Sequence, residues 1–311
     1  MIYKMNMKPA ALLAILLAGV LSSPFAANAQ DGPRSKLPPP DFANVSYGPH
    51  ARNVMDVWLA KSAKPAPLLL YFHGGGFRAG DKGNLWPAVL REALGAGITV
   101  AAANYRLSPD VSFPGHYMDC ARALQFARHS AKAWNIDPAR VALIGSSAGA
   151  GTSLWIAFHD DLADRESDDP VARESTRVSC VVVAGAQPTY DPRVIREVAG
   201  EAASRHQALV SMYGLKPGEA DSEKAHRLYG QAAPITYLTK DDPPVYAYYT
   251  EPKTAVPPSS RAGTGIHHPN LGLYLKKHMD ALNIECVVAH KSDGHNFPAE
   301  GVAFMKKHFG L

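Results

Sequence analysis

The chain has 311 residues, of which 46% are hydrophobic and 19% are charged, and its formal net charge is +4. This balance is ordinary for a globular protein with a sizeable core and excludes a disordered or fibrous chain. Three cysteines, Cys120, Cys180 and Cys286, are too few for a fold built on disulfides.

The first residues carry the pattern of a secretory signal. Lys4 and Lys8 precede the apolar run AALLAILLAGVL, and the small residues ANA follow at 27–29. The run is short for a membrane span, although a retained anchor is the alternative. We expect cleavage after Ala29, a secreted or periplasmic protein and no stable membrane insertion. Loss of the two lysines lowers the net charge from +4 to +2, which gives no basic excess for nucleic acid.

Short apolar runs alternate with helical patterns along the rest of the chain. The runs are residues 53–60, 66–72, 98–106, 139–145, 178–184, 244–249 and 284–291. Between the last two, Leu271, Leu275 and Met279 recur at helical spacing. Strand and helix in alternation predict an α/β fold with a mainly parallel sheet and helices on both faces. We expect one domain from 30 to 311.

A long polar connection, from about residue 191 to residue 242, separates the predicted strands at 178–184 and 244–249. Connections of this length in α/β folds often carry function. We expect a cap-like insertion or a wall over the site, between strands six and seven.

Two motifs point to chemistry. The strand at 139–145 runs into GSSAG at 145–149, a Gly-x-Ser-x-Gly pattern centred on Ser147. A serine projected from a sharp turn between strand and helix needs small neighbours, because the backbone there is strained. The strand at 66–72 ends in HGGGF at 73–77, and three consecutive glycines mark a place where backbone approaches another group closely.

With these motifs the sequence resembles the α/β-hydrolase superfamily, and more narrowly the esterases that pair HGGGF with GxSAG. These are the hormone-sensitive-lipase-like carboxylesterases and the acetyl or feruloyl xylan esterases. NYRLSP at 104–109, FPGHYMD at 113–119 and NIDPARVALIGSSAG at 135–149 also match. The resemblance implies an eight-stranded sheet and a serine nucleophile, and the short N-terminal segment favours the xylan-esterase-like branch.

The glycine triplet then has a role in acyl transfer. Fixed N–H groups aimed at the carbonyl oxygen stabilise its developing charge by about 3 kcal/mol per donor. Gly75, Gly76 and Ala148 are the expected donors of this oxyanion hole. His73 is expected to be structural, holding the glycine loop by hydrogen bonds.

The resemblance places the general base in a loop after the last strand, where KSDGHNF at 291–297 offers His295. The acid is expected a few residues after the seventh strand, but Lys253 stands there. Glu251 is the nearest carboxylate, and Asp191 is its rival.

No metal site or cofactor is predicted. His267 and His268 are adjacent, so their side chains should point apart. In the usual strand order, Cys180 and Cys286 are separated by a strand, which puts them about 9.6 Å apart, too far for a disulfide.

Two functions of different class remain open. The first is a secreted serine esterase acting on acetyl, other short-chain or aromatic esters of small molecules or polysaccharides. The second is a hydrolase-like binding protein with impaired turnover, for which Lys253 is the hint. A peptidase of the same fold is a further alternative.

Overall fold

An eight-stranded sheet forms the centre of the protein. In the computed structural model the described residues are 37–216 and 218–311, so the predicted signal at 1–29 lies outside them. The strands are β1 (Phe42–Ser46), β2 (Val54–Trp58), β3 (Ala66–Phe72), β4 (Thr99–Ala103), β5 (Ile136–Ser146), β6 (Cys180–Ala184), β7 (Val245–Tyr249) and β8 (Cys286–His290).

The strand order is β1-β2-β4-β3-β5-β6-β7-β8. From β4 to β8 all neighbours are parallel, whereas β2 pairs antiparallel with both β1 and β4. This confirms the predicted α/β-hydrolase fold. The seven predicted runs are all strands; β1 was not predicted, because most of its residues are exposed and it has no buried face to create a pattern.

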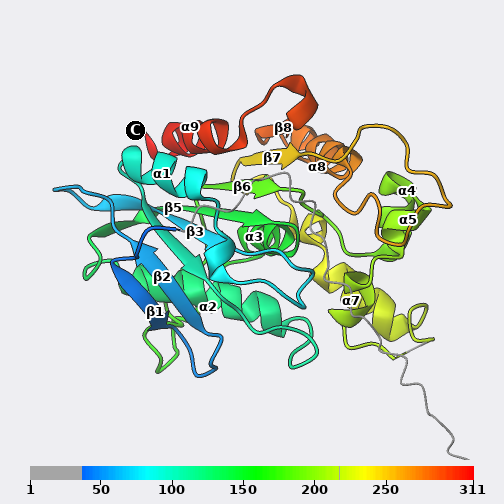
Figure 1. Ribbon diagram of the computed structural model, residues 1–311. Helices are drawn as coiled ribbons and strands as arrows, with labels where there is room; N and C mark the ends of the chain where they lie inside the picture. The colour runs from blue at the N-terminus through cyan, green and yellow to red at the C-terminus, as the bar shows by residue number, and fades with distance from the viewer. Residues whose placement is uncertain (1–36, 217) are drawn as a thin grey trace, which may run out of the picture. The chain divides into compact units, whose positions relative to one another are not determined.

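Helices cover both faces of the sheet, as predicted (Figure 1). Apolar residues of α1 and α9 form one core cluster with one face, and those of α2, α3 and α8 form a second cluster with the other. The bounds are α1 (Pro87–Gly95), α2 (Gly115–His129), α3 (Ala148–Phe158), α8 (Pro269–Ala281) and α9 (Phe297–Phe309), with short η1 (Lys82–Asn84) and η3 (Lys291–Asp293). None of the helices formed by the described residues is both long and apolar enough to span a membrane.

The predicted segment at 191–242 is mostly helical. It contains α4 (Pro192–Ala199), α5 (Glu201–Ser204), α6 (Ala208–Ser211), α7 (Glu223–Ala232) and η2 (Pro234–Tyr237). Figure 1 shows α4, α5 and α7 beyond the arrowheads of the strands. The segment therefore lies at the edge where loops after parallel strands gather, while its action as a cap stays a prediction.

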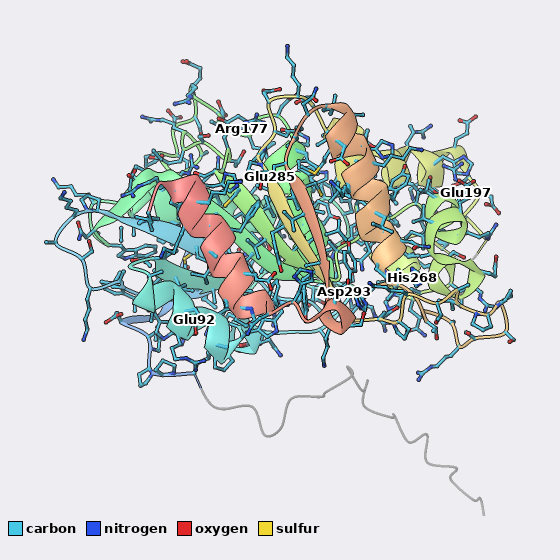
Figure 2. The ribbon with its side chains drawn as sticks, turned by 90° about the horizontal axis from the view of Figure 1, so that it is seen from above. Glu92, Arg177, Glu197, His268, Glu285 and Asp293 are labelled. Atoms are coloured by element: carbon cyan, nitrogen blue, oxygen red, sulfur yellow. The ribbon has the colours of Figure 1, made fainter. Side chains whose placement is uncertain are left out.

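The two edges of the sheet carry different loops. His268 and Asp293, which follow β7 and β8, lie at one edge, and Arg177 and Glu285, which precede β6 and β8, lie at the other (Figure 2). All three cysteines are buried and free, as predicted. Cys180 begins β6 and Cys286 begins β8, with β7 between them.

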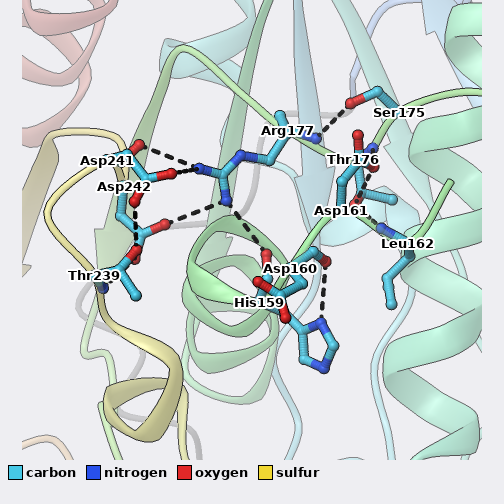
Figure 3. Close-up of polar contacts among 10 residues, drawn as sticks. All are labelled: His159, Asp160, Asp161, Leu162, Ser175, Thr176, Arg177, Thr239, Asp241 and Asp242. Carbon is cyan, nitrogen blue, oxygen red and sulfur yellow. Dashed lines mark hydrogen bonds and ion pairs between the residues drawn. The ribbon is translucent and has the colours of Figure 1, made fainter.

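Arg177, which precedes β6, is bonded to the segment after α3 and to the segment before β7 (Figure 3). Its guanidinium donates to the His159 carbonyl at 3.4 Å, to Asp241 Oδ2 at 3.2 Å and to Asp242 Oδ1 at 3.4 Å. The Asp242 side chain is fully buried. Burial raises the pKa of Asp242, and the positive charge of Arg177 opposes that shift. The arginine thus compensates a buried carboxylate.

Replacing this arginine should destabilise the fold in a pH-dependent way. Arg177→Met leaves the buried Asp242 carboxylate with its hydrogen bonds from Thr239 but without its cationic partner, so we expect the free energy of unfolding to fall by about 2 kcal/mol near neutral pH. The folded protein binds the Asp242 proton more readily than the unfolded chain, so the deficit should shrink as pH falls towards ~4. Urea unfolding at both pH values measures this. Arg165→Met, an exposed control, should change stability little, and a pH-independent deficit would contradict the explanation.

Candidate functional site

Ser147 lies at the turn from β5 into α3 with a strained backbone. Its φ is 48° and its ψ is −117°, a region that residues with a side chain rarely adopt. Its N–H donates to the Ala184 carbonyl of β6 at 2.9 Å. A Cβ atom on Gly145 would collide with the backbone of Gly149, and one on Gly149 would collide with the Phe72 carbonyl. The small residues of GSSAG are therefore required by the turn.

His267 is the histidine that meets this serine. Its Nε2 lies 2.8 Å from Ser147 Oγ, and its Nδ1 lies 3.3 Å from Glu251 Oε1. The same Glu251 oxygen accepts the backbone N–H of His267 at 3.3 Å. A proton on Nδ1, the ring nitrogen beside the carboxylate, leaves Nε2 free to accept the serine proton. The three side chains have the connectivity of a nucleophile, base and acid.

The expectation that His295 lies at the serine is wrong. Its Nδ1 contacts Glu300 Oε2 at 2.8 Å, and that oxygen also accepts the Tyr246 hydroxyl at 2.8 Å. The other oxygen of Glu300 accepts the N–H of Asn296, the residue before α9, at 2.9 Å. His295 is thus part of the start of α9.

The sequence carried a weak signal for His267. The adjacent histidines do point apart: His268 accepts the Asn270 N–H at 3.1 Å and so caps the start of α8, while His267 reaches Ser147. A histidine just before a helix that follows a parallel strand lies at the sheet edge where the strands end. The sequence did not reveal the path of the connection between β7 and α8, residues 250–268, because its residues show no periodic pattern.

Glu251 is the carboxylate that the sequence analysis predicted as the acid, but the histidine beside it is His267 and not His295. Two buried side chains fix this region. The Nε2 of His290 donates to the Glu251 carbonyl at 2.7 Å, and the amide of Gln187 donates to the carbonyls of Gly185 and Ile266, each at 2.8 Å. The loop is therefore held at the main chain of Glu251 and at the residue before His267.

The rival acid lies elsewhere. Asp191 caps the first turn of α4 through Arg193 N, and its carboxylate pairs with the Arg193 guanidinium at 2.7 Å. Lys253, which occupies the expected position of the acid, forms an exposed ion pair with Asp293 at 2.6 Å. Neither residue contacts the His267 side chain.

His73 has the structural role that was predicted. It is fully buried, its Nδ1 donates to the Gly74 carbonyl at 2.8 Å, and Arg52 Nη2 donates to its Nε2 at 3.3 Å. Arg52 also donates to the Gly80 carbonyl at 2.9 Å, and the Tyr105 ring stacks on the imidazole at 4.2 Å. Burial lowers the pKa of His73 to about 4, so the imidazole is neutral near pH ~7 and suits this bonding pattern.

Two of the three expected oxyanion donors border a small pocket with Ser147. Gly76 and Ala148 line it, whereas Gly75 lies one residue back and its carbonyl accepts the N–H of Arg78 at 3.1 Å. Gly75 and Gly76 have φ values of 114° and 59°, which favour glycine. The oxyanion role of the three residues stays a prediction.

The interior of this pocket is mainly apolar. Its cavity volume is about 10 Å³, space for the centre of a single water molecule. The remaining lining residues are Phe77, Gln187, Tyr190, His206, Ala208, Leu209 and Ile266. Two of them, Ala208 and Leu209, belong to α6. Within residues 37–216 and 218–311, no group of three or more His, Cys, Asp or Glu side chains is arranged to hold a metal ion.

A family model named BD-FAE matches residues 55–262, more than half of the chain. The chain belongs to the BD-FAE family. The matched residues include the glycine loop, Ser147 and Glu251, but end just before His267. The family match therefore covers Ser147 and Glu251, whereas the place of His267 comes from this structure alone.

Named relatives of this BD-FAE protein are esterases. Esterase LipQ of Mycobacterium tuberculosis is 25% identical over 224 residues, covering 69% of this chain and 49% of LipQ. Carboxylesterase NlhH of the same organism is 34% identical over 91 residues, covering 29% of this chain and 28% of NlhH. The chain spans about half the length of LipQ and of the carboxylic ester hydrolase LipM.

Solved structures share the fold. An acetyl ester-xyloside bifunctional hydrolase from Caldicellulosiruptor lactoaceticus aligns with a TM-score of 0.65 and 21% identity, covering 82% of this chain and 87% of that one. A carbohydrate esterase from gut microbiota aligns with a TM-score of 0.66 and 17% identity, covering 87% and 96%. At these identities the likeness supports the α/β-hydrolase fold.

The packing of the glycine loop predicts the effect of one added methyl group. A Cβ atom on Gly80 would collide with the Gly74 carbonyl and His73 Nδ1, and the φ of Gly80 is 109°. Gly80→Ala should therefore lower the free energy of unfolding by about 3 kcal/mol in urea. Gly95→Ala is the matched control, because nothing lies within 4 Å of its Cβ position, and its effect should stay within about 1 kcal/mol. Equal effects of the two substitutions would contradict this packing.

Buried histidines should make the fold sensitive to mild acid. Burial lowers the pKa values of His73 and His116 from 6.5 to about 4. Between pH 6.5 and pH 4 the unfolded chain therefore binds protons at these histidines that the folded protein does not bind. The stability that is present above pH 6.5 should be lost as the pH falls towards 4. In a series of urea titrations, His73→Gln should show a shallower pH slope than the wild type. An unchanged slope would contradict this assignment.

Proposed function

We propose that this protein is a secreted serine esterase that hydrolyses carboxylic esters through an acyl-enzyme. The observation that carries the proposal is the 2.8 Å contact of His267 Nε2 with Ser147 Oγ, backed by Glu251. Membership of the BD-FAE family and the esterase names of its relatives support it. Secretion rests on the signal pattern at 1–29.

The chemistry follows from the positions of these groups. His267 Nε2 takes the proton as Ser147 Oγ attacks the ester carbonyl, and Glu251 stabilises the imidazolium that forms. The N–H groups of Gly76 and Ala148, with Gly75, are assigned to the oxygen that gains charge. His267 then returns the proton to the leaving alcohol, and water hydrolyses the acyl-serine by the same steps. No step requires a cofactor or a metal.

The substrate is proposed to be a short-chain ester, acetyl in the first instance. The apolar interior of the pocket is small, which disfavours long acyl chains. Structural neighbours titled as an acetyl ester-xyloside hydrolase and a carbohydrate esterase make an acetylated polysaccharide a reasonable natural substrate. The alternative of a binding protein with impaired turnover rested on Lys253, which stands where the acid was expected. Glu251 lies beside His267 and can serve as that acid, which weighs against this alternative.

Substitutions of the proposed catalytic residues and of their two rivals test the proposal. With p-nitrophenyl acetate as substrate, Ser147→Ala and His267→Ala should lower kcat by about 10⁴-fold, because each removes a member of a unit that acts together. Glu251→Gln should lower kcat by about 10²-fold or more, since the neutral amide stabilises the imidazolium poorly. His295→Ala and Asp191→Asn should leave kcat within about threefold of the wild type.

The outcomes separate the alternatives. Loss of activity with His295→Ala and retention with His267→Ala would move the base to the loop after β8. Loss with Asp191→Asn and retention with Glu251→Gln would move the acid to α4. Absence of turnover by the wild type on acetyl esters and acetylated xylan would favour the binding protein.

A further inference from the structure

His206 lines the pocket, and the proposed mechanism does not use its imidazole. It lies between α5 and α6 and is one of the pocket-lining residues. A Cβ atom on Gly76 would lie 3.7 Å from its Cε1, and one on Gly263 would lie 2.7 Å from its Cδ2. The imidazole therefore fits between two glycines, and one of them is an expected oxyanion donor.

The hydrogen bonding of His206 fixes where its proton resides. Its Nδ1 accepts the Ala208 N–H at 3.2 Å, so in the neutral ring the proton is on Nε2. Burial, together with the neighbouring His267 and Arg78, lowers the pKa of His206 to about 4. Nε2 forms no hydrogen bond with any residue that the structure describes. It is also not among the buried polar atoms that lack a partner, so it is accessible. A neutral N–H donor thus remains available at the site.

The groups around the ring suggest which part of an ester it meets. The pocket interior beside Phe77 and Leu209 is apolar and has room for little more than one water molecule, so a polar alcohol part must extend outwards from it. Gln207, the residue after His206, is exposed, and its Oε1 accepts a hydrogen bond from Nη1 of the exposed Arg78 at 2.7 Å. Exposed polar side chains therefore directly follow two of the pocket-lining residues, Phe77 and His206, in the chain.

We propose that His206 Nε2 donates a hydrogen bond to a hydroxyl of the substrate's alcohol part and so selects esters of polyols such as sugars. This inference rests on the proposed esterase function and adds a specificity residue to it. A hydroxyl oxygen is a suitable acceptor for a neutral N–H, whereas a carboxylate or phosphate would be bound better by a cation. Without a hydroxyl in the ester, the same N–H contributes nothing to selection.

Two substitutions separate this contact from the structural role of the ring. His206→Asn keeps an oxygen near the position of Nδ1 for the Ala208 N–H but removes the donor at Nε2. His206→Gln places an amide donor near the position of Nε2. Val210→Ala is the control, because Val210 is an exposed residue of the same α6 helix.

The measurement compares kcat/KM for acetylated xylo-oligosaccharide with kcat/KM for p-nitrophenyl acetate, whose leaving group has no free hydroxyl. His206→Asn should lower the ratio of the two by about tenfold, the worth of one hydrogen bond. His206→Gln should restore the ratio to within about threefold of the wild type, and Val210→Ala should leave it unchanged.

Every outcome bears on the inference. Equal losses on both substrates, or no loss with His206→Asn, would overturn the role of His206 and leave the esterase proposal standing. Absence of wild-type turnover on both substrates would overturn the proposed function and this inference with it.

Discussion

The strained backbone of Ser147 is the constraint on which the rest of the site depends. A residue with a side chain at a φ of 48° and a ψ of −117° costs about 1–3 kcal/mol and persists only where its surroundings hold it. Here the surroundings are the sheet itself: β5 leads into the turn, α3 begins after it, and the Ala184 carbonyl of β6 accepts the Ser147 N–H. The serine is thus presented by rigid elements on both sides.

The same turn fixes the glycine loop. A Cβ atom on Gly74 would lie 2.9 Å from the Ser146 carbonyl oxygen and 3.3 Å from Ser147 Cβ. The loop after β3 therefore lies directly against the turn after β5, and both motifs need small residues for one reason. His73 holds that loop as a neutral ring, because burial and, to a lesser extent, the positive charge of Arg52 at its Nε2 lower its pKa to about 4. Buried bonds of this kind fix the geometry of backbone N–H groups better than surface contacts do.

Sequence patterns predicted those parts of the fold and of the site whose residue types are restricted by burial or by strained backbone. Strands buried on both faces appear as apolar runs, so β3 to β8 were found, whereas the exposed β1 was missed. Ser147 and the glycines were found because strained backbone restricts the residue types that can occupy it. His267 was missed because its position depends on a connection between β7 and α8 that no periodic pattern describes. His295 was a plausible base by position, and only its contact with Glu300 removes it.

Glu251 and His267, the proposed acid and base, lie in one connection, so their positions depend on each other. Glu251 and His267 are 16 residues apart in the chain, and each is fastened to a different strand: the Glu251 carbonyl to His290 at the end of β8, and the Ile266 carbonyl to Gln187 after β6. The Lys253–Asp293 pair further links this connection to the loop after β8. β7 lies between β6 and β8 in the sheet. The hydrogen bonds to His290 and Gln187 therefore hold Glu251 and His267 near the end of β7, the strand that precedes them. Ser147 Oγ already contacts His267 Nε2 from this connection, whereas His295, on the loop after β8, contacts Glu300.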